Sequence, residues 1–348
     1  MLTEKQINEI REHLENARNP VFFFDNDPDG LCSFLLLQRF IGRGRGVAIK
    51  TPGSLGKSYF KRVEELSADY IFVLDKPAID PEFIKMAEEK NLTIVHIDHH
   101  PPEGKVKYYY NPWLVSKTNE PTSETCYRIT RRKEDIWIAV AGTISDCFLP
   151  DFIKDFEKKY PELISCKYKS AFDVLYNSDI GKIVMIMSFG LRDKVSNVVS
   201  MMKFLMNASN PRDLLEETPK NKSFLHRFNH IYEIYKKLIN KIEQTGKGST
   251  IFFSYSGEMG LNRDLSNEIM YKHPDKIIVL AYTSGGKTNV SLRWTKGDIR
   301  TPTLKALEGL EGATGGGHDH ALGAQMTADV FPKFKERLLE EIEKIEDE

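Results

Sequence analysis

Residues 21–30 read Val-Phe-Phe-Phe-Asp-Asn-Asp-Pro-Asp-Gly, an apolar run followed by three aspartates at alternate positions and a glycine. A short apolar run bounded by turn residues is typical of a buried strand. The D-x-D-x-D-G spacing also begins the calcium loop of an EF-hand, which needs an entering helix and a glutamate at its twelfth position. Here Pro28 occupies the fourth position and Leu36 the twelfth, so an EF-hand is rejected. An acidic surface turn stays open as an interpretation of this motif alone.

Two further apolar runs follow the same plan. Tyr70–Leu74 precedes Asp75, and Leu92–Ile97 precedes Asp98. Helical patterns alternate with the apolar runs, at Leu2–Leu14, Ser33–Phe40 and Pro81–Lys90. This alternation predicts an α/β fold with a parallel sheet covered by helices. Because ligands bind at the carboxyl ends of such strands, we expect Asp25, Asp75 and Asp98 to share one crevice.

Histidines and another aspartate extend this acidic set. Asp98 begins the run Asp98-His99-His100, and Asp146 follows an apolar, helix-like segment from Ala139. Each motif alone is as easily a surface pair or a helix cap. Together, however, so many carboxylates would repel one another unless cations neutralised them. Carboxylate and imidazole ligands suit Mn²⁺ or Mg²⁺, and two such ions can clamp a phosphate, so the sequence predicts a two-metal phosphoesterase.

The remainder of the chain divides into a helical part and a second α/β part. Apolar periodicity over Ile183–Met206 and His230–Ile242 predicts a helical connecting section at residues 151–245, after a first domain at 1–150. From residue 246 to 348, we expect a smaller domain with strands at Ile251–Phe253, Lys276–Tyr282 and Asn289–Trp294, a helix at Leu265–Tyr271, and a charged helix from Phe331.

A glycine-rich segment of this last domain is a candidate anion site. Gly315, Gly316 and Gly317 precede His318, and backbone N–H groups of glycines can approach a phosphate closely. Arg293 ends a predicted strand and could hold a phosphate with two hydrogen bonds. A turn with an incidental histidine, a surface arginine, and a minor metal site at His318 and His320 are the alternatives.

Composition limits the partners. The 348 residues carry 49 Lys+Arg and 50 Asp+Glu, a net charge of −1, which disfavours a protein that coats long nucleic acids. The four cysteines form no C-x-x-C pair, and no long apolar run indicates a signal peptide or a membrane span. We therefore expect a cytoplasmic protein with no membrane contact.

With these motifs in place, the chain resembles the DHH phosphoesterase superfamily with a DHH-associated C-terminal domain, which includes RecJ-like exonucleases and nanoRNases. The resemblance covers both ends of the chain and leaves out the helical section. It implies a site in the cleft between the two domains. It also implies that Asp25, Asp27 and Asp75 hold one manganese, while Asp29, Asp75, His99 and Asp146 hold the second. His100 and Asp98 would be the catalytic residues, with His100 facing the scissile phosphate. The substrate would be held by Arg293, Gly315, Gly316, Gly317 and His318.

The resemblance leaves several functions open. Phe23 stands where some members carry histidine, and the chain is too short for the additional nucleic-acid-binding domain of bacterial RecJ. The leading expectation is a manganese-dependent exonuclease (Mg²⁺ as the other ion) acting on single-stranded DNA, RNA or short oligonucleotides. Alternatives are a phosphoesterase for dinucleotides or phosphoadenosine phosphate, a replication partner of GINS, and a pyrophosphatase. A homodimer is a further expectation.

Overall fold

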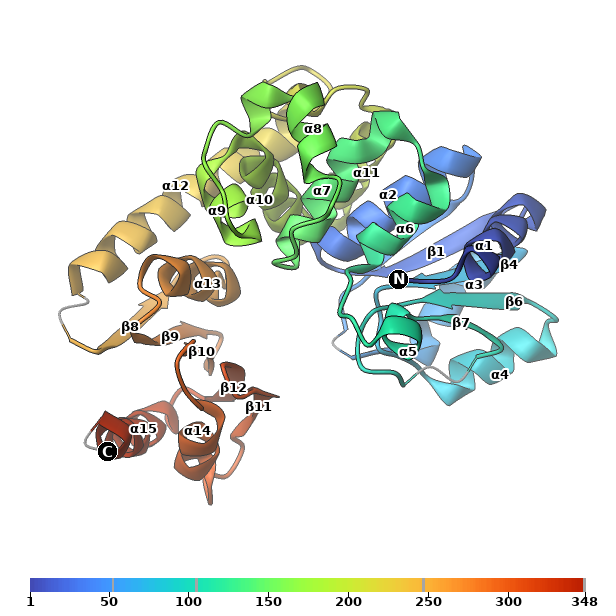
Figure 1. Cartoon of the computed structure of the whole chain (residues 1–348). Coiled ribbons are helices and arrows are strands. Elements are labelled where there is room, and N and C mark those ends of the chain that lie inside the picture. Colours follow the sequence, from blue (N-terminus) through green and yellow to red (C-terminus); the bar gives the residue numbers. More distant parts are fainter. Residues whose placement is uncertain (52, 104–105, 246–247, 347–348) are drawn as a thin grey trace. The chain divides into compact units, whose positions relative to one another are not determined.

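The computed structural model describes residues 1–51, 53–103, 106–245 and 248–346 (Figure 1). Residues 1–228 form one compact unit and residues 229–348 a second, and the long helix α12 (Lys222–Thr245) contributes to both. Each unit has its own sheet, so each is described by itself.

The first unit contains a five-stranded parallel sheet in the order β2-β1-β4-β6-β7. Its strands are β1 (Pro20–Asp25), β2 (Arg45–Ile49), β4 (Tyr70–Leu74), β6 (Thr93–Ile97) and β7 (Tyr108–Tyr110). The three central strands are the ones predicted, whereas the two short edge strands, most of whose residues are partly exposed, were missed. In the register, Phe24 lies beside Leu74 and Leu74 beside Ile97. The next residues along each strand are therefore neighbours at one end of the sheet.

Helix α2 (Pro28–Ile41) begins five residues before the predicted start at Ser33. Asp27 caps it by accepting a hydrogen bond from the Gly30 N–H, and Pro28 occupies its first position, where its missing N–H costs nothing. A Cβ on Gly30 would lie 2.6 Å from the Asp25 carbonyl oxygen. The glycine is required because the first turn of the helix lies directly against the strand end.

Helices cover the sheet and build the middle of the chain. They are α1 (Glu4–Asn16), α3 (Phe60–Glu65), α4 (Pro81–Glu89), α5 (Pro112–Ser116), α6 (Thr122–Thr130), α7 (Ile136–Ser145), α8 (Ile153–Lys159), α9 (Ala171–Asn177), α10 (Asp179–Leu191) and α11 (Val195–Asn207). Short 3₁₀ turns occur at Lys57–Tyr59, Lys133–Asp135, Pro161–Leu163 and Pro211–Leu214, and β3 (Ser54–Leu55) pairs with β5 (Ala78–Ile79). The single helix expected over Ile183–Met206 is two helices, α10 and α11, since the polar residues 192–194 interrupt it.

The second unit is built on a sheet in the order β11-β12-β10-β9-β8. Its strands are β8 (Thr250–Ser256), β9 (Ile277–Ser284), β10 (Lys287–Arg293), β11 (Thr314–His318) and β12 (Ala321–Thr327), and its further helices are α13 (Asn262–Lys272), α14 (Arg300–Leu307) and α15 (Phe331–Glu346). Only β8 and β9 run parallel, and Leu292, Leu322 and Phe334 belong to the apolar core beneath the sheet. The α/β class expected for both ends of the chain is confirmed, while the three-part domain division stays a prediction.

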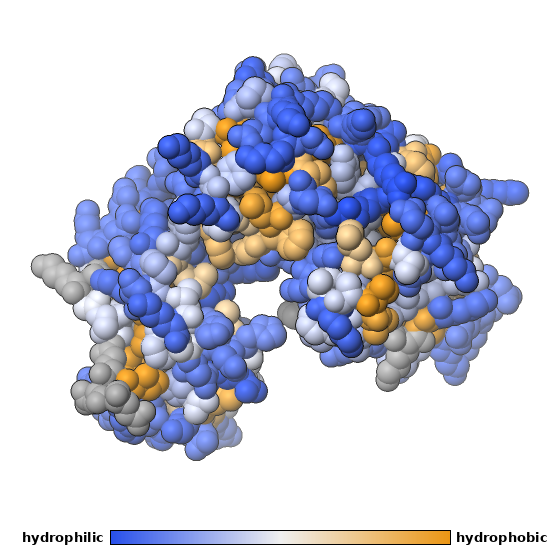
Figure 2. Space-filling model, viewed as in Figure 1, coloured by the Kyte–Doolittle hydropathy of each residue, from blue (hydrophilic) through white to orange (hydrophobic). Residues whose placement is uncertain are grey.

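Hydrophilic side chains cover most of the face shown in Figure 2, with apolar patches between them. Among the described helices, none combines the length and apolar character that crossing a membrane requires.

Candidate active site

The carboxyl ends of β1, β4 and β6 carry Asp25, Asp75 and Asp98. Asp75 directly follows β4 with φ +58°, in the left-handed region that is costly for most residues and tolerated best by Asp and Asn. Its backbone N–H still donates to the Ile97 carbonyl at 2.9 Å. The sheet thus holds Asp75 in an unusual conformation at the centre of its carboxyl edge.

His99 lies between two carboxylates. Its Nε2 atom is 3.3 Å from Asp75 Oδ1 and 3.3 Å from Asp146 Oδ2. On the other side of the ring, Nδ1 lies 2.8 Å from Asn119 Oδ1, an oxygen that can only accept, so Nδ1 carries a proton. Burial alone would lower the pKa of His99, but hydrogen bonding to Asp75 and the surrounding negative charges raise it to about 11. Asn119 had no signal in the sequence.

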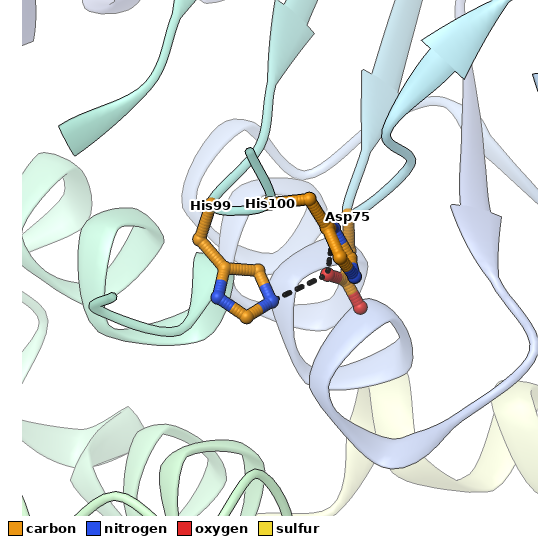
Figure 3. Close-up of side chains that lie close together, drawn as sticks. All are labelled: Asp75, His99 and His100. Carbon is orange, nitrogen blue, oxygen red and sulfur yellow. Dashed lines mark ion pairs between the residues drawn. The ribbon is translucent and has the colours of Figure 1, made fainter. Parts of the chain in front are cut away.

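Figure 3 shows both imidazole rings, His99 and His100, turned toward the carboxylate of Asp75. The Nδ1 atom of His100 lies between two carboxylates, 2.8 Å from Asp98 Oδ1 and 3.9 Å from Asp75 Oδ1. Asp98 is fully buried, and Tyr109 and Asn111 approach its other oxygen at 3.4 Å. Asp98 therefore contacts the Nδ1 atom of His100 and does not belong to the candidate metal-binding groups of the other acids.

Asp29 is buried in the first turn of α2 and accepts three hydrogen bonds from the start of α6. The N–H groups of Thr122 and Ser123 donate to it at 2.8 and 3.1 Å, and the Ser123 hydroxyl donates as well. Burial, followed by the charges of Asp75 and Asp146, raises the pKa of Asp29 well above its usual range. The helix N-terminus compensates this buried charge in part.

A buried lysine that sequence reasoning missed, Lys76, contacts the first acidic motif. Its ammonium lies 2.7 Å from Asp25 Oδ1 and 2.9 Å from the Thr51 carbonyl oxygen, and only 1% of the side chain is exposed. Its position directly after Asp75 is the one sequence signal. Lys76 compensates the negative charge of Asp25. It forms no ion pair with the other carboxylates of the described cluster, so their mutual repulsion is not relieved by it.

The structure brings together all six residues expected as metal ligands. Oxygen or nitrogen atoms lie within 4.8 Å of one another in three groups: Asp25, Asp27 and Asp75; Asp29, His99 and Asp146; and Asp75, His99 and His100. Burial, followed by the charge of Asp27, raises the pKa of Asp75 well above its usual range, because crowded buried carboxylates disfavour ionisation. A cluster of carboxylates with imidazole fits divalent Mn²⁺ or Mg²⁺, whose charge would relieve this repulsion.

The expected substrate-binding residues lie in the second unit. The glycine-rich segment forms the edge strand β11 and not the turn that was the alternative interpretation, because Gly315–His318 pairs with Ala321–Ala324 of β12. Gly317 has φ +147°, and a Cβ there would lie 2.5 Å from the Ala321 carbonyl oxygen. His318 and the glycines are exposed.

Arg293 ends β10, as predicted, and its guanidinium is anchored within the unit. Nε donates to Asn267 Oδ1 at 2.9 Å and Nη1 to the Leu292 carbonyl at 2.8 Å. His320 is also tied to its own unit, with Nδ1 2.9 Å from the Gly297 carbonyl oxygen. A metal at His320 would therefore use the other ring nitrogen, Nε2.

Two protein families match the chain. The DHH family, N-terminal domain, matches residues 21–149, and the DHHA1 domain matches residues 237–344. The first match contains the whole acidic cluster, and the second contains β8–β12. No curated protein sequence matches the chain.

Solved structures with low sequence identity share the fold. RecJ of Thermus thermophilus, crystallised with Mn²⁺, has a TM-score of 0.69 at 18% identity, over 96% of this chain and 53% of that protein. A second RecJ exonuclease, bound to manganese, has a TM-score of 0.65 at 17% identity, with 96% and 92% of the two chains covered. A pGpG-specific phosphodiesterase from Vibrio cholerae has a TM-score of 0.52 at 15% identity, with 94% and 99% covered. The chain spans about half the length of Thermus RecJ.

The two family matches, in this order along the chain, agree with a parallel-sheet unit that carries the acidic cluster and a separate unit that carries the glycine-rich strand. The chain belongs to the DHH superfamily of metal-dependent phosphoesterases.

Proposed function

We propose that the protein is a manganese-dependent exonuclease that hydrolyses single-stranded DNA or RNA, with short oligonucleotides as its main substrates. The observation that carries this proposal is that Asp25, Asp27, Asp29, Asp75, His99 and Asp146 belong to overlapping groups of three whose ligand atoms lie within 4.8 Å of one another. The fold shared with RecJ structures crystallised with Mn²⁺ supports it.

In this proposal, Asp75 serves both metal positions. Asp25, Asp27 and Asp75, one of the three groups described above, would hold one ion. Asp29, His99 and Asp146, a second group, would hold the other together with Asp75. When bound, two such ions supply the positive charge that activates a water and stabilises the phosphate oxygens during displacement. Lys76 keeps Asp25 in place, and the N-terminus of α6 keeps Asp29 in place.

His100 is proposed to contact the scissile phosphate. Its Nδ1 is held by Asp98, so the Nε2 edge of a side chain that is 37% exposed is the part available to substrate. An imidazole oriented in this way can donate a hydrogen bond to a phosphate oxygen or transfer a proton. Asp98 acts through His100 as a positioning residue.

The second unit is proposed to hold the substrate away from the reacting phosphate. Residues 246–348 would be the substrate-binding domain, joined to the catalytic domain (1–150) by residues 151–245. The exposed glycines of β11 offer backbone N–H groups, and His318 and Arg293 offer side-chain donors. Substrates longer than a few nucleotides should depend most on these residues.

The test is digestion of end-labelled DNA and RNA ladders in the presence of Mn²⁺. Asp75→Asn should lower the rate by several orders of magnitude because it removes the ligand shared by both positions. Asp80→Asn is the matched control, since Asp80 caps α4 outside the cluster and asparagine caps equally well. Wild-type rates in the Asp75→Asn enzyme would show that the cluster is not the active site.

A dinucleotide phosphodiesterase is the second candidate. The near-neutral charge of −1 favours a short substrate, and the fold is also shared with the pGpG-specific enzyme. Rates measured from dinucleotides to long single strands separate the two. A sharp maximum at two nucleotides would favour this candidate over the exonuclease.

A further inference from the structure

An apolar groove in the first unit lies along the free edge of β2, the terminal strand of the sheet. β2 pairs with β1 and, among the described strands, with no other. Successive residues from Gly44 to Ala48 line a pocket of about 460 Å³, so the pocket follows the edge of the strand and not one of its faces. Neighbouring β2 residues point to opposite faces, and only an edge can present all of them.

Helices form the two walls of this groove. On one side lies α11, with Val198 and Met202 buried and Val195 and Val199 exposed by 65% and 37%. On the other side lie Tyr59, Arg62 and Leu66, which belong to the segment around α3. Val195 and Val199 are two of the few large apolar side chains that the described residues expose.

The rim of the groove is uniformly basic. Its charged residues are Arg45, Lys50, Arg62 and Lys203, and no carboxylate lines it. Arg62 is paired with Glu65 at 2.6 Å, and the Lys50 ammonium lies 3.4 Å from the Asp193 carbonyl oxygen. In the part of the chain that the structure describes, Arg45 and Lys203 make no ion pair. The groove is therefore short of negative charge.

These features select one kind of occupant. A second copy of this groove in a two-fold contact would place like charges opposite one another, which is unfavourable. A nucleic acid would use the cations, but its bases bind best on exposed aromatic rings, and Phe34, one of the two aromatic residues that line the groove, is buried. Tyr59 is half-buried, and its hydroxyl already accepts a hydrogen bond from the Lys50 N–H.

We propose that the groove binds an extended segment of a partner protein, with alternating acidic and aliphatic residues, as a sixth strand on the edge of β2. The backbone of the segment would hydrogen-bond to β2, its aliphatic side chains would pack on Val195, Val199 and Met202, and its carboxylates would meet Arg45 and Lys203. Strand addition of this kind obtains affinity from main-chain hydrogen bonds and specificity from alternate side chains. This surface is separate from the acidic cluster.

The probe is a fluorescein-labelled decapeptide of alternating glutamate and valine, titrated into the full-length protein and followed by fluorescence anisotropy. We expect saturable binding that weakens with salt, and a loss of about tenfold or more in affinity when both Arg45 and Lys203 are changed to glutamate. The matched control changes Lys5 and Lys85 to glutamate, which alters the net charge equally at exposed sites outside the groove and should leave affinity unchanged.

Two further probes test the mode of binding on the unaltered protein. A decapeptide with alternate backbone nitrogens methylated, whose methyl groups face β2, should fail to bind, since it cannot donate to the strand. Lysine–valine peptides and oligothymidine should not compete. No binding of the acidic peptide, equal binding of the methylated one, equal losses in both charge variants, or competition by oligothymidine would each overturn the proposal. Self-association abolished by Val199→Glu would assign the groove to a second copy and overturn it too.

Discussion

Asp98→Asn is the substitution that best separates positioning from chemistry in the proposed site. Asp98 is fully buried and accepts the hydrogen bond from His100 Nδ1 at 2.8 Å. Asparagine keeps the shape of the side chain and removes its negative charge. The ring of His100 then loses the nearer of the two carboxylates at its Nδ1 atom, since Asp75 Oδ1 lies 3.9 Å away.

The expected size follows from this contact. A buried hydrogen bond to a charged group contributes about 1.5–3 kcal/mol, which corresponds to a loss of about 10- to 150-fold in rate. His100→Ala removes the whole imidazole and should cost about 10²–10⁴-fold. Because Asp98 acts through His100, the double variant should be no slower than His100→Ala alone.

The assay is single-turnover cleavage of a labelled oligonucleotide by the wild-type enzyme, both single variants and the double variant. Thermal unfolding of each variant verifies that the fold is intact. Tyr109→Phe is the control, since it removes a 3.4 Å contact to the same carboxylate and a hydrogen bond from Asn111, leaves the Asp98–His100 contact in place, and should change the rate little. If the losses from Asp98→Asn and His100→Ala multiply in the double variant, Asp98 acts independently of His100 and the reasoning is refuted.

Three further predictions concern stability and metal binding. Asp135→Ala should lower the unfolding free energy in urea by about 3–5 kcal/mol, because it leaves the buried guanidinium of Arg39 without the carboxylate 2.8 Å away. The control, Lys57→Met, breaks only an exposed ion pair and should leave the unfolding midpoint nearly unchanged. Burial, opposed by a neighbouring arginine, raises the pKa of Glu124 from 4.5 to about 7. The unfolding free energy of the wild type relative to Glu124→Gln should therefore be greatest below pH 4.5 and decline as the pH rises through 7, and a flat difference would contradict this. Mn²⁺ at about one hundred times its dissociation constant should stabilise the fold by about 2.7 kcal/mol, measured by thermal unfolding, and Asp75→Asn should lose most of this gain while EDTA reverses it in the wild type.

The local sequence pattern was sufficient to predict the central strands and the acidic residues that follow them. The apolar run before Asp25 and the turn residues after it depend on neighbours in the chain, so periodicity and composition predict them. The edge strands β2 and β7 were missed because they are short and mostly partly exposed, so neither is marked by the long buried run of the central strands. The early start of α2 was missed because its cap, Asp27, belongs to the same motif as the expected metal ligands.

Contacts between distant segments could not be predicted from the sequence. Asp29 accepts hydrogen bonds from residues 93 and 94 positions later in the chain, and Lys76 reaches Asp25 across the strand ends. The glycine-rich segment paired as β11 because β12 lies beside it, although its composition indicates a turn.

By itself the sequence determined the superfamily, the α/β class, and the order of the acidic motifs, since residue types and spacings carry that information. Tertiary structure alone decided that Asp98 contacts His100 Nδ1, and that Lys76 and the start of α6 compensate the charges of Asp25 and Asp29. It also decided that a groove with apolar walls and a basic rim follows the free edge of β2. The physical reason is that charge compensation and exposure depend on which distant segments pack together, and this is a property of the folded chain as a whole.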